Sequence, residues 1–246
     1  MQSSLSARQS LEMRATRRRI LRLVGGVIAV GTGLHRATAV AQSPQFRDAD
    51  RTRDKIVAAV RAFARGDSGP LPDIQQIKPI PEVAIPGVAV QPEHLPLIDY
   101  FVGDLQLRYS FDDPKHLSSV SASDLKRLKL KREELLPLSI ANFRRLYPNF
   151  KVDRVQPHLA SVTGAGELEP SLMLESRFWE QERERAGSEI LAAVPARDAL
   201  LFSNRAVTRN VDVLKGVAAD VYETAGKNAL SRKLFLWNQG RWEVFA

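Results

Sequence analysis

Apolar and polar residues alternate strictly along residues 105–111, with the apolar side chains at Leu105, Leu107, Tyr109 and Phe111. Because successive side chains of a strand point to opposite faces, this pattern predicts a strand with one buried face. Shorter apolar runs predict three further pairs of strands, at 151–156 with 159–163, 190–194 with 199–203, and 233–237 with 241–245. The last two pairs are expected to be hairpins, because turn-forming residues separate their strands.

Apolar residues recur with helical spacing before each pair of strands. The pattern predicts helices that begin near Glu134 and that cover 171–185 and 208–222, and Ser121-x-x-Asp124 has the spacing of a capping box. The order helix–strand–strand therefore recurs three times, at roughly 133–163, 171–203 and 208–245. This order predicts an α+β fold in which a mostly antiparallel sheet carries its helices on one face.

The residues before this main domain show two further patterns. Residues 48–65 carry an apolar stripe at helical spacing, which predicts a helix that stops at Gly66. Residues 67–96 hold seven of the chain's 14 prolines, so we expect an extended strap or linker, with room for a short edge strand at 82–89. The predicted organisation is a signal peptide at 1–41, an N-terminal helix at 42–66, the strap at 67–96 and an α+β main domain at 97–246.

The first 41 residues have the three parts of an export signal. Arg17 and Arg18 lie in a twin-arginine motif, an apolar run at 23–34 follows, and Ala39 and Ala41 are the small residues of a cleavage site. The apolar run is too short to span a bilayer, which needs about 20 residues. We expect export by the twin-arginine route to the periplasm or beyond, with membrane contact only during export and cleavage after Ala41. The alternative is an uncleaved anchor or a basic tail.

The formal net charge of +8 suggests a nucleic-acid partner, but most of that charge lies in the signal. Seven arginines and one glutamate give residues 1–41 a charge of +6, whereas residues 42–246 hold 29 basic and 27 acidic residues, a net charge of +2. A nearly neutral mature chain argues against a nucleic-acid partner. The absence of cysteine from the sequence excludes disulfides, thiolate catalysis and cysteine-ligated clusters.

The sequence shows no motif for a metal or a cofactor. His94, His116 and His158 are far apart, and Gly164-Ala-Gly166 lacks the lysine of a phosphate-binding loop. We therefore expect no metal and no cofactor.

Two positions of the main domain are candidates for ligand binding. Arg197-Asp198 lies at the joint between two predicted strands, where a rigid scaffold can present a loop site. The alternative is a structural pair, in which Asp198 accepts backbone hydrogen bonds within the turn. Asn142, inside an apolar helix, either satisfies a buried backbone group or faces a pocket.

Further candidates lie around the helix predicted over 171–185. Ser171 is at its start, where a capping role competes with a catalytic one. Glu175, one turn before Trp179, is expected to face the same cleft as Asn142, and Glu169 with Glu175 are the carboxylates available for acid–base chemistry. The three tryptophans either anchor the core or form a platform for a sugar or a partner.

The run Ala-Val-Pro-Ala-Arg-Asp-Ala-Leu-Leu-Phe at 193–202 is the strongest of several family-like segments, and weaker ones lie at 124–128, 133–143, 166–179 and 230–243. Together they resemble the YtpQ-like bacterial proteins, a family of unknown function, over about residues 105–245. Pro137, Pro170 and the export signal depart from that pattern. The resemblance implies a fold and gives no reaction.

These observations favour a non-enzymatic exported module that binds an unknown protein or small molecule. Its expected contact residues are Asn142, Ser171, Glu175, Arg197 and Asp198. The competing hypothesis is a periplasmic hydrolase of unknown substrate class that uses Ser171, Glu175 and Asp198.

Overall fold

The computed structural model describes residues 51–63, 78–79, 91–113, 116–156 and 159–245. The expected signal peptide, with Arg17, Arg18, Ala39 and Ala41, lies outside the described residues, as do most of the strap and the edge strand expected at 82–89. Among the helices that are described, none is both long and apolar enough to cross a membrane.

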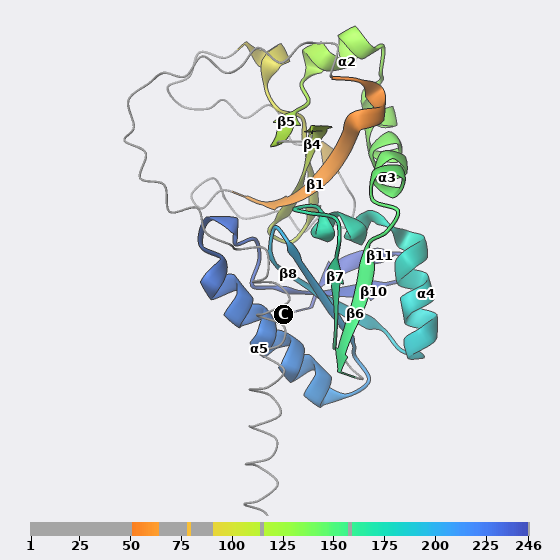
Figure 1. Cartoon of the computed structure of the whole chain (residues 1–246), viewed down its shortest axis with the longest axis vertical. Coiled ribbons are helices and arrows are strands. Elements are labelled where there is room, and N and C mark those ends of the chain that lie inside the picture. The colour runs from red at the N-terminus through yellow and green to blue at the C-terminus, as the bar shows by residue number, and fades with distance from the viewer. Residues whose placement is uncertain (1–50, 64–77, 80–90, 114–115, 157–158, 246) are drawn as a thin grey trace, which may run out of the picture.

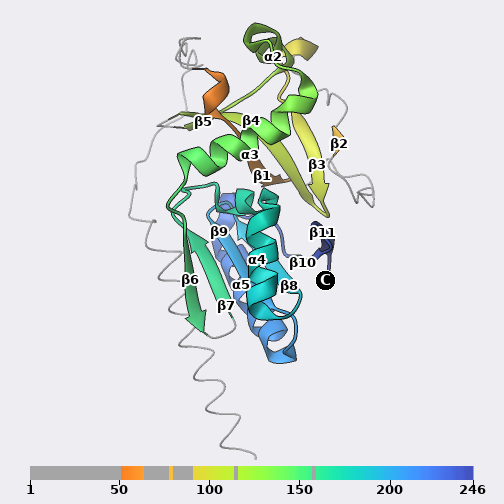
Figure 2. The same ribbon diagram turned by 90° about the vertical axis from the view of Figure 1, so that its right-hand side faces the viewer.

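The first sheet is antiparallel and has the strand order β1-β4-β3-β2, with β5 paired to β4 (Figures 1 and 2). Its strands are β1 (Ile56–Ala62), β2 (Lys78–Pro79), β3 (Ile98–Val102), β4 (Leu105–Asp113) and β5 (His116–Ser119). The alternating run at 105–111 is the strand β4, as predicted.

Two helices, α2 (Ala122–Leu128) and α3 (Leu135–Leu146), follow the first sheet. The predicted capping box of α2 is present: the Asp124 backbone N–H donates to Ser121 Oγ at 3.3 Å, and Asp124 Oδ2 accepts from the Ser121 N–H at 3.0 Å. A 3-10 turn precedes α3, which therefore begins at the predicted place with Pro137 in its first turn, where a missing N–H costs nothing. Helix α3 packs along β1 (Figure 2).

The second sheet is also antiparallel, with the strand order β11-β10-β8-β9-β7-β6. Its strands are β6 (Lys151–Gln156), β7 (Leu159–Thr163), β8 (Ile190–Ala196), β9 (Ala199–Asn204), β10 (Leu234–Asn238) and β11 (Arg241–Val244). The three predicted strand pairs are neighbours in this sheet, and the two expected hairpins are confirmed. The chain is therefore an α+β protein with antiparallel sheets, as predicted.

The expectation that one sheet carries its helices on one face is wrong, because helices cover both faces of the second sheet (Figure 1). Helix α4 (Ser176–Ala186) places Trp179 among the β8 and β9 side chains of one face, and α5 (Thr208–Ala225) places Leu214 on the other. Every residue of β8 is buried. A strand that is covered on both faces can be apolar throughout, so its sequence does not show whether the helices lie on one face of the sheet or on both.

The helix predicted over 48–65 is also wrong, since the described part of that segment forms a 3-10 turn at Arg53–Lys55 and then the strand β1. Residues 56–61 are all buried. Ile56 and Ala58 face the helices α2 and α3, whereas Val57 and Ala59 face the core shared with the second sheet. Burial on both faces removes the alternation of apolar and polar residues that is typical of a strand. The spacing of the apolar residues in this segment is then similar to the apolar stripe of a helix.

One hydrophobic core joins the two sheets. It includes Val60 and Leu107 from the first sheet, Phe143 from α3, and Trp179 and Phe202 from the second layer. The sheets therefore pack as one body, and the side of the junction that this core does not fill forms a cleft.

Candidate functional site

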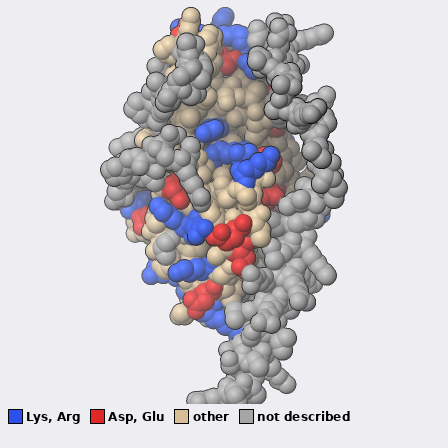
Figure 3. All heavy atoms as spheres, turned by 90° about the vertical axis from the view of Figure 1, so that its left-hand side faces the viewer, with Lys and Arg blue, Asp and Glu red and all other residues tan. Residues whose placement is uncertain are grey.

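A cleft of about 1200 Å³ lies between the two sheets. The first sheet contributes β1, β4 and β5, and the second layer contributes the 164–168 loop, the β8–β9 turn and the C-terminal end of α5 with the 3-10 turn at Gly226–Asn228. Lys and Arg side chains gather across the middle of the face that carries this end of α5 (Figure 3).

Strand register explains why the first sheet presents polar side chains to the cleft. Ala59 of β1 is directly opposite Arg108 of β4, and Ser110 of β4 is opposite Ser119 of β5, so these residues and Arg61 share one face of the sheet. The other face is apolar and packs on α2 and α3. The same alternation that buries one face of β4 therefore sends Arg108 and Ser110 into the cleft.

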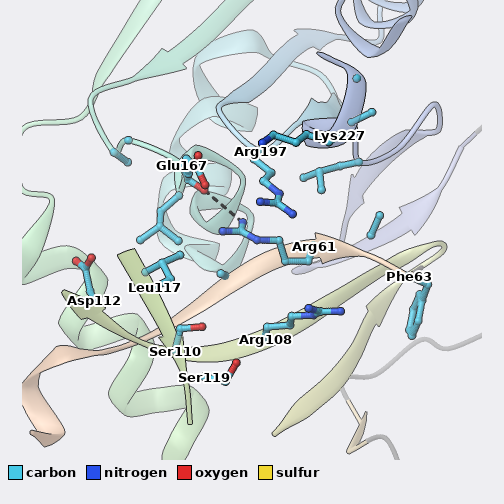
Figure 4. Close-up of a pocket in the computed structure, with 18 of the residues that line it drawn as sticks. Arg61, Phe63, Arg108, Ser110, Asp112, Leu117, Ser119, Glu167, Arg197 and Lys227 are labelled. Carbon is cyan, nitrogen blue, oxygen red and sulfur yellow. Dashed lines mark hydrogen bonds between the residues drawn. The ribbon is translucent and has the colours of Figure 1, made fainter. Parts of the chain in front are cut away.

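Arg61 is the most buried cation of the cleft, with 9% of its surface exposed. Its Nη1 donates to the carbonyl of Val60 at 2.9 Å and to that of Glu167 at 3.3 Å, so the side chain joins the first sheet to the 164–168 loop (Figure 4). Burial, followed by repulsion from Arg197, lowers the pKa of Arg61 to about 10. The guanidinium is therefore held charged at neutral pH in a site that penalises its charge.

Arg197 approaches the same place from the β8–β9 turn (Figure 4). Its backbone N–H donates to the carbonyl of Asn228 at 3.0 Å, which fixes the turn against the end of α5. Its Nε is buried without a hydrogen-bond partner. Among the described residues, no acidic side chain forms an ion pair with Arg61 or with Arg197.

Most acidic side chains that line the cleft are engaged elsewhere. Asp112 Oδ2 accepts from the Tyr147 hydroxyl at 2.7 Å, Asp113 pairs with Lys55 at 3.9 Å, and Glu223 pairs with Arg232. Lys55 and Arg232 therefore compensate the charges of Asp113 and Glu223, whereas the hydrogen bond from the neutral Tyr147 hydroxyl leaves Asp112 charged.

A buried carboxyl group, Glu169, lies behind the 164–168 loop and is only 4% exposed. Its Oε1 accepts from the Ala165 N–H at 3.1 Å, and its Oε2 has no hydrogen-bond partner. Burial raises the pKa of Glu169 to about 7, backbone hydrogen bonds oppose the rise, and the charge of Asp198 adds to it. Burial and the hydrogen bond to Asp112 likewise raise the pKa of the Tyr147 phenol.

Of the five residues proposed from the sequence, Arg197 lines the cleft, and Asp198 follows it in the turn without lining it. Asn142 Nδ2 donates to the backbone carbonyls of Arg53 at 2.8 Å and Ile56 at 2.9 Å. The structure thus confirms the first alternative for Asn142, a buried amide that satisfies backbone groups, here by joining α3 to β1.

Ser171 and Glu175 do not line the cleft. Ser171 lies inside a 3-10 turn at Glu169–Leu174 rather than at a helix cap, and its buried Oγ has no partner. Glu175 Oε2 accepts from Arg144 Nε at 2.6 Å, which ties α3 to the start of α4. The helix predicted over 171–185 is thus a 3-10 turn followed by α4.

The three tryptophans are core anchors. Trp179, Trp237 and Trp242 are 0, 2 and 6% exposed, and the rings of Trp179 and Trp242 meet edge to face at 4.8 Å. Within the described part of the chain, no group of three or more His, Asp or Glu side chains has the arrangement of a metal site. His94 Nδ1 lies 3.1 Å from Ser123 Oγ, and His158 is outside the described residues.

Sequence reasoning missed Arg61, Arg108 and Lys227. Arg61 lies in a segment for which the sequence predicted a helix. Lys227 follows the end of a helix, where the sequence carries no binding motif. The alternating pattern at 105–111 did contain a signal for Arg108, because the polar positions of that strand share a face.

No family model matches the chain. It is similar to a UPF0354 protein of Staphylococcus haemolyticus, 22% identical over 151 residues that make up 61% of this chain and 53% of that protein. It is also similar to a UPF0354 protein of Halalkalibacterium halodurans, again 22% identical over 151 residues, 61% of this chain and 57% of the relative. The chain thus spans about half the length of the curated relatives it matches. No solved structure matches it. The relatives are proteins of unknown function, so the similarity brings no activity to the cleft.

Proposed function

We propose that the chain is an exported, non-enzymatic module that binds a ligand or partner in the cleft between its two sheets. The twin-arginine motif at Arg17 and Arg18 and the small residues Ala39 and Ala41 support export to the periplasm or beyond. The similarity to UPF0354 proteins and the run at 193–202 support a YtpQ-like main domain.

The observation that carries the binding proposal is the meeting of Arg61 and Arg197 in one cleft without an acidic partner among the described residues. Placing like charges together in a partly desolvated site costs free energy, and an isolated folded chain gains nothing from it. A bound group of opposite charge offsets that cost. The cleft volume of about 1200 Å³ leaves room for a small molecule or a protruding segment of a partner.

A hydrolase is the second candidate, and the observation that favours it is the pKa of Glu169 near 7, which suits a general acid or base at neutral pH. Its side chain is only 4% exposed, however, and Ser171 does not line the cleft. Ester, phosphate, glycoside and peptide panels test this candidate. Turnover that Glu169→Gln or Asp198→Asn abolishes would favour the hydrolase over the binding module.

Site-specific photo-cross-linking tests the binding module. The photoreactive analogue p-benzoylphenylalanine replaces Phe63, which lines the cleft, or Phe245, which does not and serves as the matched control. We expect envelope extract to give an adduct from position 63 that Arg197→Gln removes. Equal adducts from both positions, or an adduct at 63 that does not depend on Arg197, would contradict the proposal.

A further inference from the structure

Resting on the proposed function of the cleft, we infer that the group bound beside Arg61 and Arg197 is a phosphate dianion, as in inorganic phosphate or a phosphomonoester. The inference depends on three features of the cleft: its charge, an unsatisfied donor, and the directions from which the cations approach.

The charge of the inner cleft matches a dianion. Among the described residues, Arg61, Arg197 and Lys227 line the cleft without an ion pair to an acidic side chain. Of the lining carboxylates, Glu167 is the one that is not engaged by a lysine, an arginine or a tyrosine. The Tyr147 hydroxyl is neutral, so Asp112 keeps its charge. The cations of the lining are Arg61, Arg108, Arg197, Lys227 and Arg232, and Lys55 pairs with Asp113. These six cations against the four lining carboxylates leave two positive charges, which a phosphomonoester neutralises at neutral pH.

The buried Nε of Arg197 is an unsatisfied donor. A buried N–H of a charged group without an acceptor costs more than a neutral one, so the folded chain leaves a place for an acceptor next to Arg197. An anion oxygen in the cleft would accept from this N–H and also reduce the repulsion between Arg197 and Arg61.

The cations approach from three separate elements. Arg61 comes from β1, Arg197 from the β8–β9 turn and Lys227 from the 3-10 turn after α5, and Arg197 lies between the other two (Figure 4). A carboxylate offers two oxygens in one plane and a single charge. A tetrahedral phosphate offers oxygens in several directions, which suits donors that converge from different sides.

Two hydroxyl groups extend the same wall of the cleft. Ser110 and Ser119 are paired across β4 and β5 beside Arg108 (Figure 4). They can donate to further oxygens of the ligand, so a phosphomonoester with a polar body fits the cleft better than inorganic phosphate alone.

The same phosphate chemistry occurs in soluble phosphomonoesters and in the headgroup of phosphatidic acid. Calorimetry with the full chain at about pH 8 and constant ionic strength compares inorganic phosphate and glycerol 3-phosphate with dimethyl phosphate, acetate and neutral glycerol. Sedimentation with phosphatidylcholine vesicles, with and without phosphatidic acid, tests the lipid source. Binding of the soluble dianions, or of phosphatidic acid vesicles alone, supports the dianion and identifies its source.

We expect the dianions to bind at least about tenfold more tightly than dimethyl phosphate or acetate. Arg197→Gln should weaken that binding by at least about tenfold and Lys227→Gln by a smaller factor. Arg177→Gln, an exposed arginine of α4 outside the cleft, is the matched control and should leave binding unchanged.

Two results would overturn the phosphate inference: acetate or glycerol binding as tightly as phosphate, or phosphate binding that survives Arg197→Gln. The cross-linking at position 63 separates this failure from failure of the binding module. An Arg197-dependent adduct without phosphate affinity would support the binding module and contradict the phosphate inference. The absence of both the adduct and phosphate affinity would contradict the binding module as well.

Discussion

The guanidinium of Arg61, on the first sheet, and that of Arg197, in a turn of the second, meet in one cleft and repel each other (Figure 4). The fold brings them together through long-range packing, since Arg61 also donates to a carbonyl 106 residues away, that of Glu167. A pair of like charges held in this way lowers the stability of the folded chain and is typical of a site that binds a ligand of opposite charge.

Removing Arg197 should therefore not destabilise the empty protein. Arg197→Gln should raise the free energy of unfolding by about 0.5 kcal/mol at low ionic strength, with a smaller gain at high salt, because it removes repulsion on Arg61 and no ion pair among the described residues. Urea unfolding followed by tryptophan fluorescence measures this change. A loss of more than about 1 kcal/mol would show that Arg197 is a structural residue.

Glu169 should make stability fall as pH rises. The folded state holds its proton with a pKa near 7, against 4.5 as the ordinary value, so the folded chain binds more protons than the unfolded chain between these values. The full stability is present below about pH 4.5 and declines as pH rises to about 7.

Glu169→Gln removes this titration and keeps an acceptor for the Ala165 N–H. The variant should match the wild type near pH 4.5 and exceed it at pH 8 by roughly 3 kcal/mol. Unfolding curves at both pH values test the difference, with the exposed Glu184→Gln of α4 as the control. A variant that is less stable than the wild type at pH 8 would refute the raised pKa of Glu169.

Asn142 should contribute to stability rather than to binding. Asn142→Ala leaves the carbonyls of Arg53 and Ile56 without their donor and should lower the free energy of unfolding by about 1–3 kcal/mol. Asn149→Ala, at an exposed position after the same helix, should change it by less than about 0.5 kcal/mol. Equal free energies of unfolding for the two variants would show that the hydrogen bonds from Asn142 to β1 and the turn before it do not stabilise the protein.

The export proposal predicts a defined cellular location. Arg17→Lys with Arg18→Lys should leave the chain in the cytoplasm, whereas Arg8→Lys with Arg14→Lys should not, because only the first pair lies in the twin-arginine motif. Cell fractionation measures location, and N-terminal sequencing of the exported chain should begin at Gln42. Export that is unchanged by the first pair of substitutions would point to another route.

Local periodicity was enough to predict β4, the two hairpins of the second sheet and helix α5. Each is defined by neighbours within a few residues, through alternation, a turn or a helical stripe. Strand β1 was mistaken for a helix, because burial on both faces leaves a sequence without alternation. Helices on both faces of the second sheet were missed for the same reason, since the apolar strand β8 does not show which layer covers it.

The site was harder to predict than the fold. Arg197 could be predicted as a site residue because the sequence places it in a turn between two strands. Arg61 and Lys227 lie in the same cleft only because β1 and α5 pack there in the folded chain. Asn142 and Glu175 were chosen as polar residues in apolar surroundings, and both proved to satisfy structural partners. A polar residue in an apolar helix shows that a partner exists, and only the three-dimensional structure shows whether it is backbone, side chain or ligand.

The most direct test of the phosphate cleft is a crystal structure of the full chain grown with glycerol 3-phosphate. We predict a phosphate group between Arg61 and Arg197, with the Nε of Arg197 donating to one of its oxygens. An empty cleft at a ligand concentration that saturates binding in solution, or a phosphate bound on another surface, would contradict the account.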